Sequence, residues 1–178
     1  MVHVSLWTVL LCGLVVGPFV ACKPPMVGVL FRRHLTDVSS FFPSPRRPQV
    51  ILIDNAKDFE RLNDLLYAGF RKRLPDGTVQ DELLILVLGG VKPDAGYEIL
   101  VDQVLRDGSS GDLVLRIQEK HDLLAAELFE VTYPFSLISV RRAAWSGKLR
   151  CVDIKNRAWD ADVHYAFDEG IIKKGSDR

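Results

Sequence analysis

The stretch from residue 83 to residue 140 constrains the fold most, because apolar and polar residues alternate along it between glycine-rich turns. It opens with an apolar run (83–88) followed by two glycines. Such a run is typical of a strand buried on both faces, although a buried helix segment of this length has the same composition. Alternation follows over residues 97–102 and 113–118, on either side of a turn cluster at 106–111. Period-two alternation between turns predicts antiparallel strands with one buried face.

The same pattern returns near the end of this stretch. Phe129, Val131 and Tyr133 alternate with polar residues, Pro134 interrupts the alternation, and residues 137–140 resume it. Proline cannot donate to a β ladder, so Pro134 predicts a break or bulge in the sheet.

A strand and a helix are expected before the sheet. Residues 49–53 are apolar enough for a strand, and Asn55 is a candidate helix N-cap with Asp58 in capping-box register. Apolar residues at helical spacing then run from Phe59 to a predicted stop at Gly69. We therefore expect a mainly β fold with one helix (α+β), in which a strand–helix unit precedes a small antiparallel sandwich or barrel.

Length and charge limit the classes of function. The chain has 178 residues, which suits one domain plus a leader, and its 23 basic residues are matched by 23 acidic ones. This balance gives no electrostatic case for a nucleic-acid partner. Its 3 cysteines, one of them in the leader, cannot form a disulfide framework.

The N-terminus predicts export. Residues 4–20 are dominated by apolar side chains and no charged side chain precedes Lys23, so residues 1–21 are a predicted signal peptide. The segment Phe19-Val20-Ala21-Cys22 resembles a bacterial lipobox, which implies that Cys22 is lipidated and anchors the chain to a membrane of the cell envelope, facing the periplasm or the cell surface. An ordinary signal peptide or an uncleaved anchor are the alternatives.

Domain boundaries follow from these segments. Prolines and serines make residues 22–48 a predicted linker that carries the lipobox cysteine. Phe31, Phe41 and Phe42 are too apolar for a purely solvated linker, so part of the segment is expected to pack against the domain. The β-rich domain is expected over 49–168, with a frayed tail at 169–178. Cys151 stays unpaired if Cys22 is lipidated, and a disulfide between the two is conceivable otherwise.

Chemistry-bearing motifs are scarce. Asp160, Asp162 and His164 alternate on one face of a predicted strand, a pattern that could bind a cation. The solvated face of an amphipathic strand explains it better, so we predict no metal and no cofactor. The chain has no nucleophile-elbow, zinc-binding or phosphate-loop motif, and we predict that it is not an enzyme.

Two motifs resemble those of a known family. Residues 89–99 resemble the Gly-x-x-Pro-x-x-Gly-Tyr loop and strand of the protease complex subunit PrcB C-terminal domain family, and residues 132–138 are similar to its Thr-x-Pro signature before a last strand. The resemblance covers roughly residues 81–142. It implies an exported, non-catalytic domain with a protein partner, in the named member a surface protease complex.

Five residues of these motifs are candidate partner contacts: Pro93, Gly96, Tyr97, Tyr133 and Pro134. A proline limits the freedom of the loop, a glycine permits positive φ, and a tyrosine is a common interface anchor. Alternatively, these residues only shape a sharp turn and a bulge. The loop is also similar to that of chagasin-type cysteine-protease inhibitors, so inhibition is a second hypothesis, and a structural envelope lipoprotein is a third.

Overall fold

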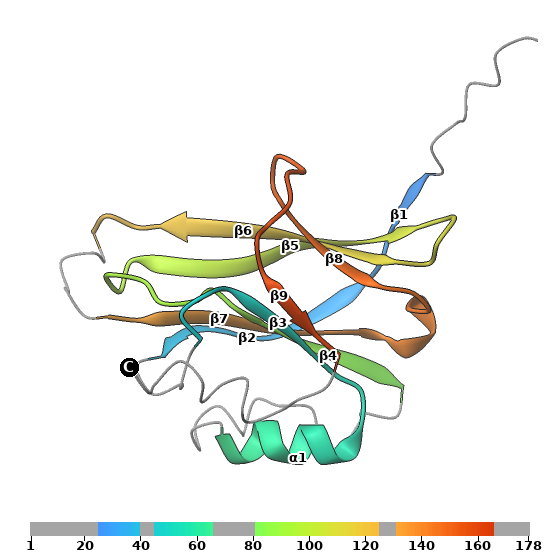
Figure 1. Ribbon diagram of the computed structural model, residues 1–178, viewed down its shortest axis with the longest axis horizontal. Helices are drawn as coiled ribbons and strands as arrows, with labels where there is room; N and C mark the ends of the chain where they lie inside the picture. The colour runs from blue at the N-terminus through green and yellow to red at the C-terminus, as the bar shows by residue number, and fades with distance from the viewer. Residues whose placement is uncertain (1–24, 40–44, 66–80, 125–130, 166–178) are drawn as a thin grey trace, which may run out of the picture.

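The computed structural model describes residues 25–39, 45–65, 81–124 and 131–165 (Figure 1). Several predictions fall outside these ranges: the signal peptide, the lipidation of Cys22, the helix stop at Gly69 and the tail at 169–178.

Two β-sheets pack face to face, and one α-helix covers the outer face of the larger sheet (Figure 1). The four-stranded sheet has the order β1 (Met26–Gly28), β5 (Tyr97–Asp107), β6 (Leu113–His121), β8 (Leu149–Asp153). The five-stranded sheet has the order β2 (Phe31–Ser39), β7 (Tyr133–Arg141), β4 (Glu82–Leu88), β3 (Gln49–Ile53), β9 (Asp162–His164). The helix is α1 (Ala56–Leu65). The predicted fold class, mainly β with one helix, is confirmed for the described residues.

The apolar run at 83–88 is strand β4, and its burial explains its composition. Alternate residues of β4 face the second sheet, where Leu83, Ile85 and Val87 join the core between the sheets. The others face the helix, where Leu84, Leu86 and Leu88 pack with Leu62 of α1. A strand covered on both faces needs apolar side chains at every position, which is what the run supplies.

The N-cap of α1 forms as predicted. The backbone N–H of Asp58 donates to Oδ1 of Asn55 at 2.9 Å, and Nδ2 of Asn55 donates to Oδ2 of Asp58 at the same distance. This arrangement satisfies a backbone donor that the first helical turn otherwise leaves without a partner. Further along the helix, Leu62 is fully buried and Phe59 packs against the same cluster.

The sheets are mixed, which corrects the expectation of purely antiparallel pairing. Strand β8 pairs in parallel with β6, and β9 pairs in parallel with β3. Both parallel strands come from residues 149–164, after the segment that constrained the prediction. Alternation shows that a strand has a buried face, but it does not encode the direction of its neighbour.

The predicted linker at 22–48 is wrong in part, since strands β1 and β2 lie within it. Strand β2 pairs with β7 from Phe31 to Ser39, and Val29 and Phe31 pack against the core between the sheets. The prolines that suggested a linker flank residues 26–39 rather than interrupt them. The β structure therefore begins at Met26.

The predicted break at Pro134 occurs on one side of β7 only: the ladder to β4 ends just before it, whereas the ladder to β2 runs through it. Pro134 is the second residue of β7, one position beyond the last β4 pair, Leu88 with Phe135. The carbonyl of Pro134 accepts a hydrogen bond from Gly89 N–H at 2.8 Å, but proline has no N–H to return a bond to Gly89, so the pairing with the β4 side stops here. The register shifts lie elsewhere, in β2 and β5.

Two crossing segments join the sheets. On one side β1 pairs with β5 and the same chain continues into β2 of the other sheet, where Arg33 donates through Nη2 to the carbonyl of Val101 at 2.8 Å. On the other side the chain leaves β8, folds back on it through the Trp159 N–H to Cys151 carbonyl bond (3.0 Å), and joins the other sheet as β9. Within the described ranges, no helix has the length and apolar content needed to cross a bilayer.

Candidate functional site

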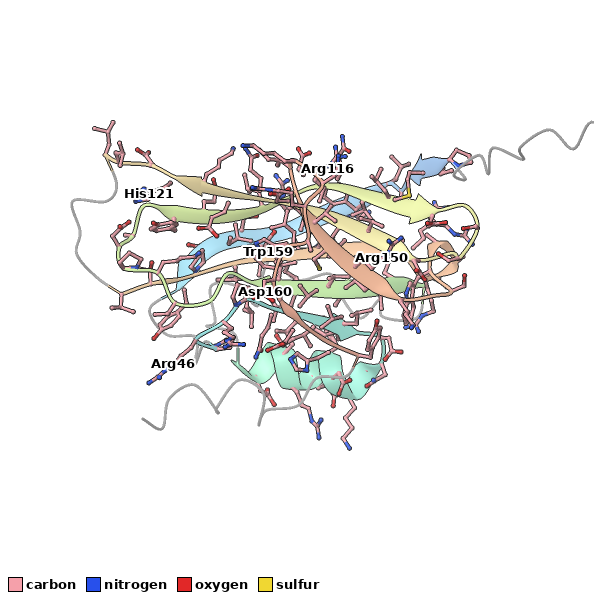
Figure 2. All side chains as sticks on the ribbon, turned by 45° about the horizontal axis from the view of Figure 1, so that its top comes forward. Arg46, Arg116, His121, Arg150, Trp159 and Asp160 are labelled. Carbon is pink, nitrogen blue, oxygen red and sulfur yellow. The ribbon has the colours of Figure 1, made fainter. Side chains whose placement is uncertain are left out.

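The loop from Gly89 to Tyr97 lies at one end of the sandwich, beside the end of β6 and the start of β7. We call this the loop end and define it as residues 89–97, 121–124 and 131–132. Figure 2 shows His121 at this end, far from Arg150 on the other side of the molecule. Two antiparallel backbone bonds join Lys92 to Thr132 (2.9 and 3.1 Å), and the Asp122 N–H donates to the Gly96 carbonyl (2.8 Å). The loop is thus bound to two other segments by its backbone.

Asp94 connects the parts of the loop end. Its carboxylate accepts the Gly96 N–H at 2.8 Å and lies 3.1 Å from Nε2 of His121, while its carbonyl accepts the Thr132 hydroxyl at 2.6 Å. One residue therefore bonds its own loop, the end of β6 and the segment before β7. Such cross-links leave the loop little freedom to lose when it binds.

Gly96 is needed for a different reason than predicted. Its φ is not positive, whereas Gly90 of the same loop has φ 74°. Gly96 is buried, and a Cβ added there would lie 2.3 Å from the carbonyl oxygen of Asp122. The absence of a side chain lets the two backbones approach closely. Gly96 therefore shapes the loop and offers a partner no surface.

Tyr97 takes part in the packing of the loop end. Its ring stacks on the His121 ring, with centroids 4.2 Å apart and planes at 21°, and Nζ of Lys92 lies 5.1 Å from the ring centroid. The same Nζ is 2.7 Å from Oε2 of Glu119. Tyr97 is only half-buried, so part of it remains available to a partner.

The three remaining candidate partner contacts, Pro93, Tyr133 and Pro134, differ in how deeply they are buried. Pro93 is exposed at the tip of the loop and Tyr133 is half-buried. Pro134 is buried, and its Cγ would be 2.9 Å from a Cβ added at Gly89. Pro134 can therefore serve binding only by supporting the loop from beneath.

Sequence analysis missed the exposed apolar residues around the loop. We call them the apolar rim: Val91 (43% exposed), Leu123 (76%), Leu124 (84%) and Val131 (52%), with Pro93 among them. The antiparallel Lys92–Thr132 bridge brings the segments of Val91 and Val131 together, and the Asp122–Gly96 bond brings in the leucine pair. The sequence does contain a signal for this exposure. The two leucines follow five polar residues (118–122), so they do not continue the alternating apolar pattern of a buried strand.

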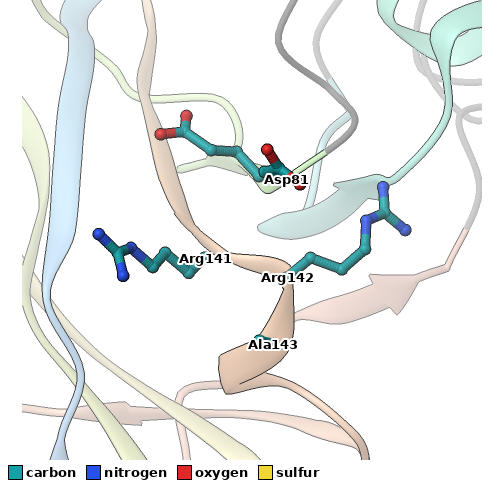
Figure 3. Close-up of a pocket in the computed structure, with 5 residues that line it drawn as sticks. Asp81, Arg141, Arg142 and Ala143 are labelled. Atoms are coloured by element: carbon teal, nitrogen blue, oxygen red, sulfur yellow. The ribbon is translucent and has the colours of Figure 1, made fainter.

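A hollow lies away from the loop end (Figure 3). It is lined by Asp81, Glu82, Arg141, Arg142 and Ala143, so it presents charges of both signs. Arg142 is already engaged, since its Nη2 donates to the carbonyl of Asp54 and its N–H donates to the carbonyl of Asp81 (2.8 Å). We assign Arg142 a structural role in joining β3, β4 and β7.

Two kinds of reactive site can be checked among the described residues: a cation shared by Asp162 and His164, and a nucleophile at Cys151. Asp162 and His164 lie on β9, and among the residues that the structure describes no three potential metal-ligand side chains gather closely enough to share an ion. Cys151 packs against the core between the sheets, and its burial raises the pKa of the thiol to about 12. A thiol that stays protonated at neutral pH is a poor nucleophile.

No family model, curated protein or solved structure matches this chain. The resemblance to the PrcB C-terminal domain family therefore stays a prediction that rests on two motifs.

Proposed function

We propose that this chain is an exported, lipid-anchored protein whose β domain binds a protein partner through the loop end, without catalysing a reaction. The resemblance implies a protease complex of the cell envelope as the partner, for which this chain is an accessory subunit. Lipidation of Cys22 supplies the membrane attachment.

One observation carries the proposal: a cross-linked loop is surrounded by exposed apolar side chains. Isolated exposed hydrophobic residues are ordinary on protein surfaces, but several around one loop mark an interaction site. Leu123 and Leu124 are adjacent in the chain and are 76% and 84% exposed. Burying a leucine side chain fully contributes about 1.5–3 kcal/mol, so covering the rim supplies a useful part of a binding free energy.

The polar groups of the loop end support the same use. Lys92 is paired with Glu119, and the Asp94 carboxylate accepts the Gly96 N–H and lies 3.1 Å from His121, so both charges have partners within the domain. A partner that covers the rim therefore does not have to provide a counter-charge for each of them. The rigid loop also lowers the entropy cost of docking.

The test is photo-crosslinking in native membranes. A benzophenone amino acid at Val131 of the full chain is expected to capture a defined protein, and Leu124→Asp is expected to abolish capture. Ile154→Asp is the matched control, because Ile154 is also an exposed apolar residue (50%) but follows β8, outside the loop end. Equal capture by both variants would show that the rim is not the binding surface.

The anchor is tested separately by the mass of the mature N-terminus. A diacylated cysteine at position 22 is expected, and an unmodified N-terminus would remove the lipid anchor from the proposal while leaving the protein-binding surface intact.

No observation favours the inhibitor hypothesis. An inhibitory loop has to enter the cleft of a protease, and here Gly96 is buried while Tyr97 stacks on His121. The exposed residues of the loop are Val91 and Pro93.

A further inference from the structure

The described part of the chain begins at an exposed apolar corner. The described residues include 9 exposed large hydrophobic side chains, and 3 of them lie at this corner: Met26 (39%), Val27 (54%) and Leu30 (95%). The turn between β5 and β6 lies beside them, since a Cβ added at Gly108 would be 3.1 Å from the carbonyl oxygen of Pro25. We call Pro25–Leu30 with the turn 107–111 the β1 corner.

The β1 corner and the loop end lie at opposite ends of one strand. Strand β5 starts at Tyr97 in the loop end and finishes at Asp107, which pairs with Met26 of β1. At about 3.3 Å per residue, the ten steps of this strand separate the two ends by about 33 Å. Figure 1 shows β1 and the β5–β6 turn on the side away from the loop that precedes β5.

The position of the cysteine limits how far this corner can lie from a membrane. Cys22 and Met26 are four positions apart, and a fully extended chain spans at most about 3.6 Å per residue, so the α-carbons of the two are at most about 14 Å apart. This is less than half of the distance between the two ends of β5. Attachment at Cys22 therefore brings the β1 corner to the lipid surface.

We infer that the β1 corner contacts the phospholipid bilayer that holds lipidated Cys22, through Met26, Val27 and Leu30, and that the loop end points away from the bilayer. This inference rests on the lipid anchor of the proposed function. It adds an orientation: the partner approaches from the side opposite the membrane.

The corner suits apolar contact better than electrostatic contact. Arg150 pairs with Asp107 (3.3 Å) and lies 3.8 Å from Asp112, so its charge is balanced there. Hydrogen bonds from the hydroxyl and backbone N–H of Ser109 and from the N–H of Ser110, with a contribution from Arg150, lower the pKa of Asp107 to about 2, which keeps this carboxylate ionised. Since charges of both signs meet at this turn, the contact is expected to depend on the apolar residues and to persist at high salt.

The test compares two exposed leucines at opposite ends of the domain. The full lipidated chain, in a Cys151→Ala background, receives a single cysteine by Leu30→Cys or by Leu123→Cys, and each is labelled with an environment-sensitive NBD fluorophore. Both proteins are reconstituted into phosphatidylethanolamine–phosphatidylglycerol vesicles containing a doxyl-labelled lipid. The label at position 30 is expected to shift to the blue and lose most of its emission, and the label at position 123 is expected to keep its emission.

Flotation of the vesicles separates the two ways of failing. If the protein floats with the vesicles but the label at position 30 is not quenched, or the label at position 123 is quenched instead, the orientation is overturned while the anchor stands. If the full chain does not float, the anchor fails and the orientation fails with it. A repeat in high salt that removes quenching would overturn the apolar character of the contact.

Discussion

At the scale of single residues, Gly96 was correctly singled out, but the reason expected for a glycine at this position was wrong. The sequence shows that a glycine stands before Tyr97, and positive φ was the expected reason. The actual reason is the approach of the Asp122 backbone, a contact between segments 26 positions apart in the chain that no local pattern reveals.

The Gly96 contact makes a testable prediction about stability. In Gly96→Ala, the new Cβ would lie 2.3 Å from the Asp122 carbonyl, so the two segments must separate and the Gly96–Asp122 bond is weakened. We expect a loss of about 1–3 kcal/mol in the free energy of unfolding, measured by urea denaturation. Gly28→Ala is the matched control, since nothing lies within 4 Å of the Cβ position there. Equal stability of the two variants would contradict the close-contact explanation.

A second residue-scale prediction concerns Cys151, whose thiol pKa is raised to about 12 by burial. In a chain with Cys12 and Cys22 replaced by serine, this thiol is expected to react slowly with Ellman's reagent at pH 8 and rapidly in urea. The thiol ionises at lower pH when unfolded than when folded. Its contribution to stability is therefore complete below the unfolded value near 9 and lost as pH rises toward 12. Equal rates with and without urea would show that the thiol is accessible in the folded state.

At the scale of elements, the helix start was predictable because its signal is local. Asn55 and Asp58 are three positions apart, and the Asp58 N–H donates to the Asn55 side chain as a capping box requires, while the return bond comes from the Asn55 side-chain amide instead of its backbone N–H. We expect Asn55→Ala to lower the free energy of unfolding by about 0.5–2 kcal/mol in urea denaturation, the range for a lost N-cap. Glu60→Ala, at an exposed position of the same helix, should change it by much less. A similar loss in both variants would mean that the cap adds nothing specific.

A strand was predictable where its own side-chain pattern shows its burial. It was not predictable where only pairing with a neighbouring strand makes the segment a strand. The runs behind β4, β5 and β6 show their burial in their own side chains, and all three form. Strands β1 and β2 were missed because prolines at both ends gave the segment the composition of a linker, although β2 needs only the edge of β7 to pair with. The same limit applies to the site, since the rim residues Leu123 and Val131 come together only through the bonds of the loop end.

At the scale of the whole molecule, the domain has two exposed apolar regions at the two ends of β5, about 33 Å apart by strand length. Sites separated by much more than 10 Å without shared partners are expected to contribute independently. In the proposed function one end of the domain holds the membrane and the other holds a protein partner, so the sheets between them would fix how far from the membrane that partner binds.

This arrangement predicts a clean separation of two defects. Leu124→Asp should abolish partner capture and leave the lipid quenching of a label at position 27 unchanged, because Leu124 lies in the loop end and Val27 in the β1 corner. Leu30→Asp should reduce that quenching and leave capture at Val131 unchanged. The double variant should show both defects at the sizes of the single ones. If either single substitution altered both measurements, the two ends would be coupled through the sheets, and the independent use of the domain's ends would be refuted.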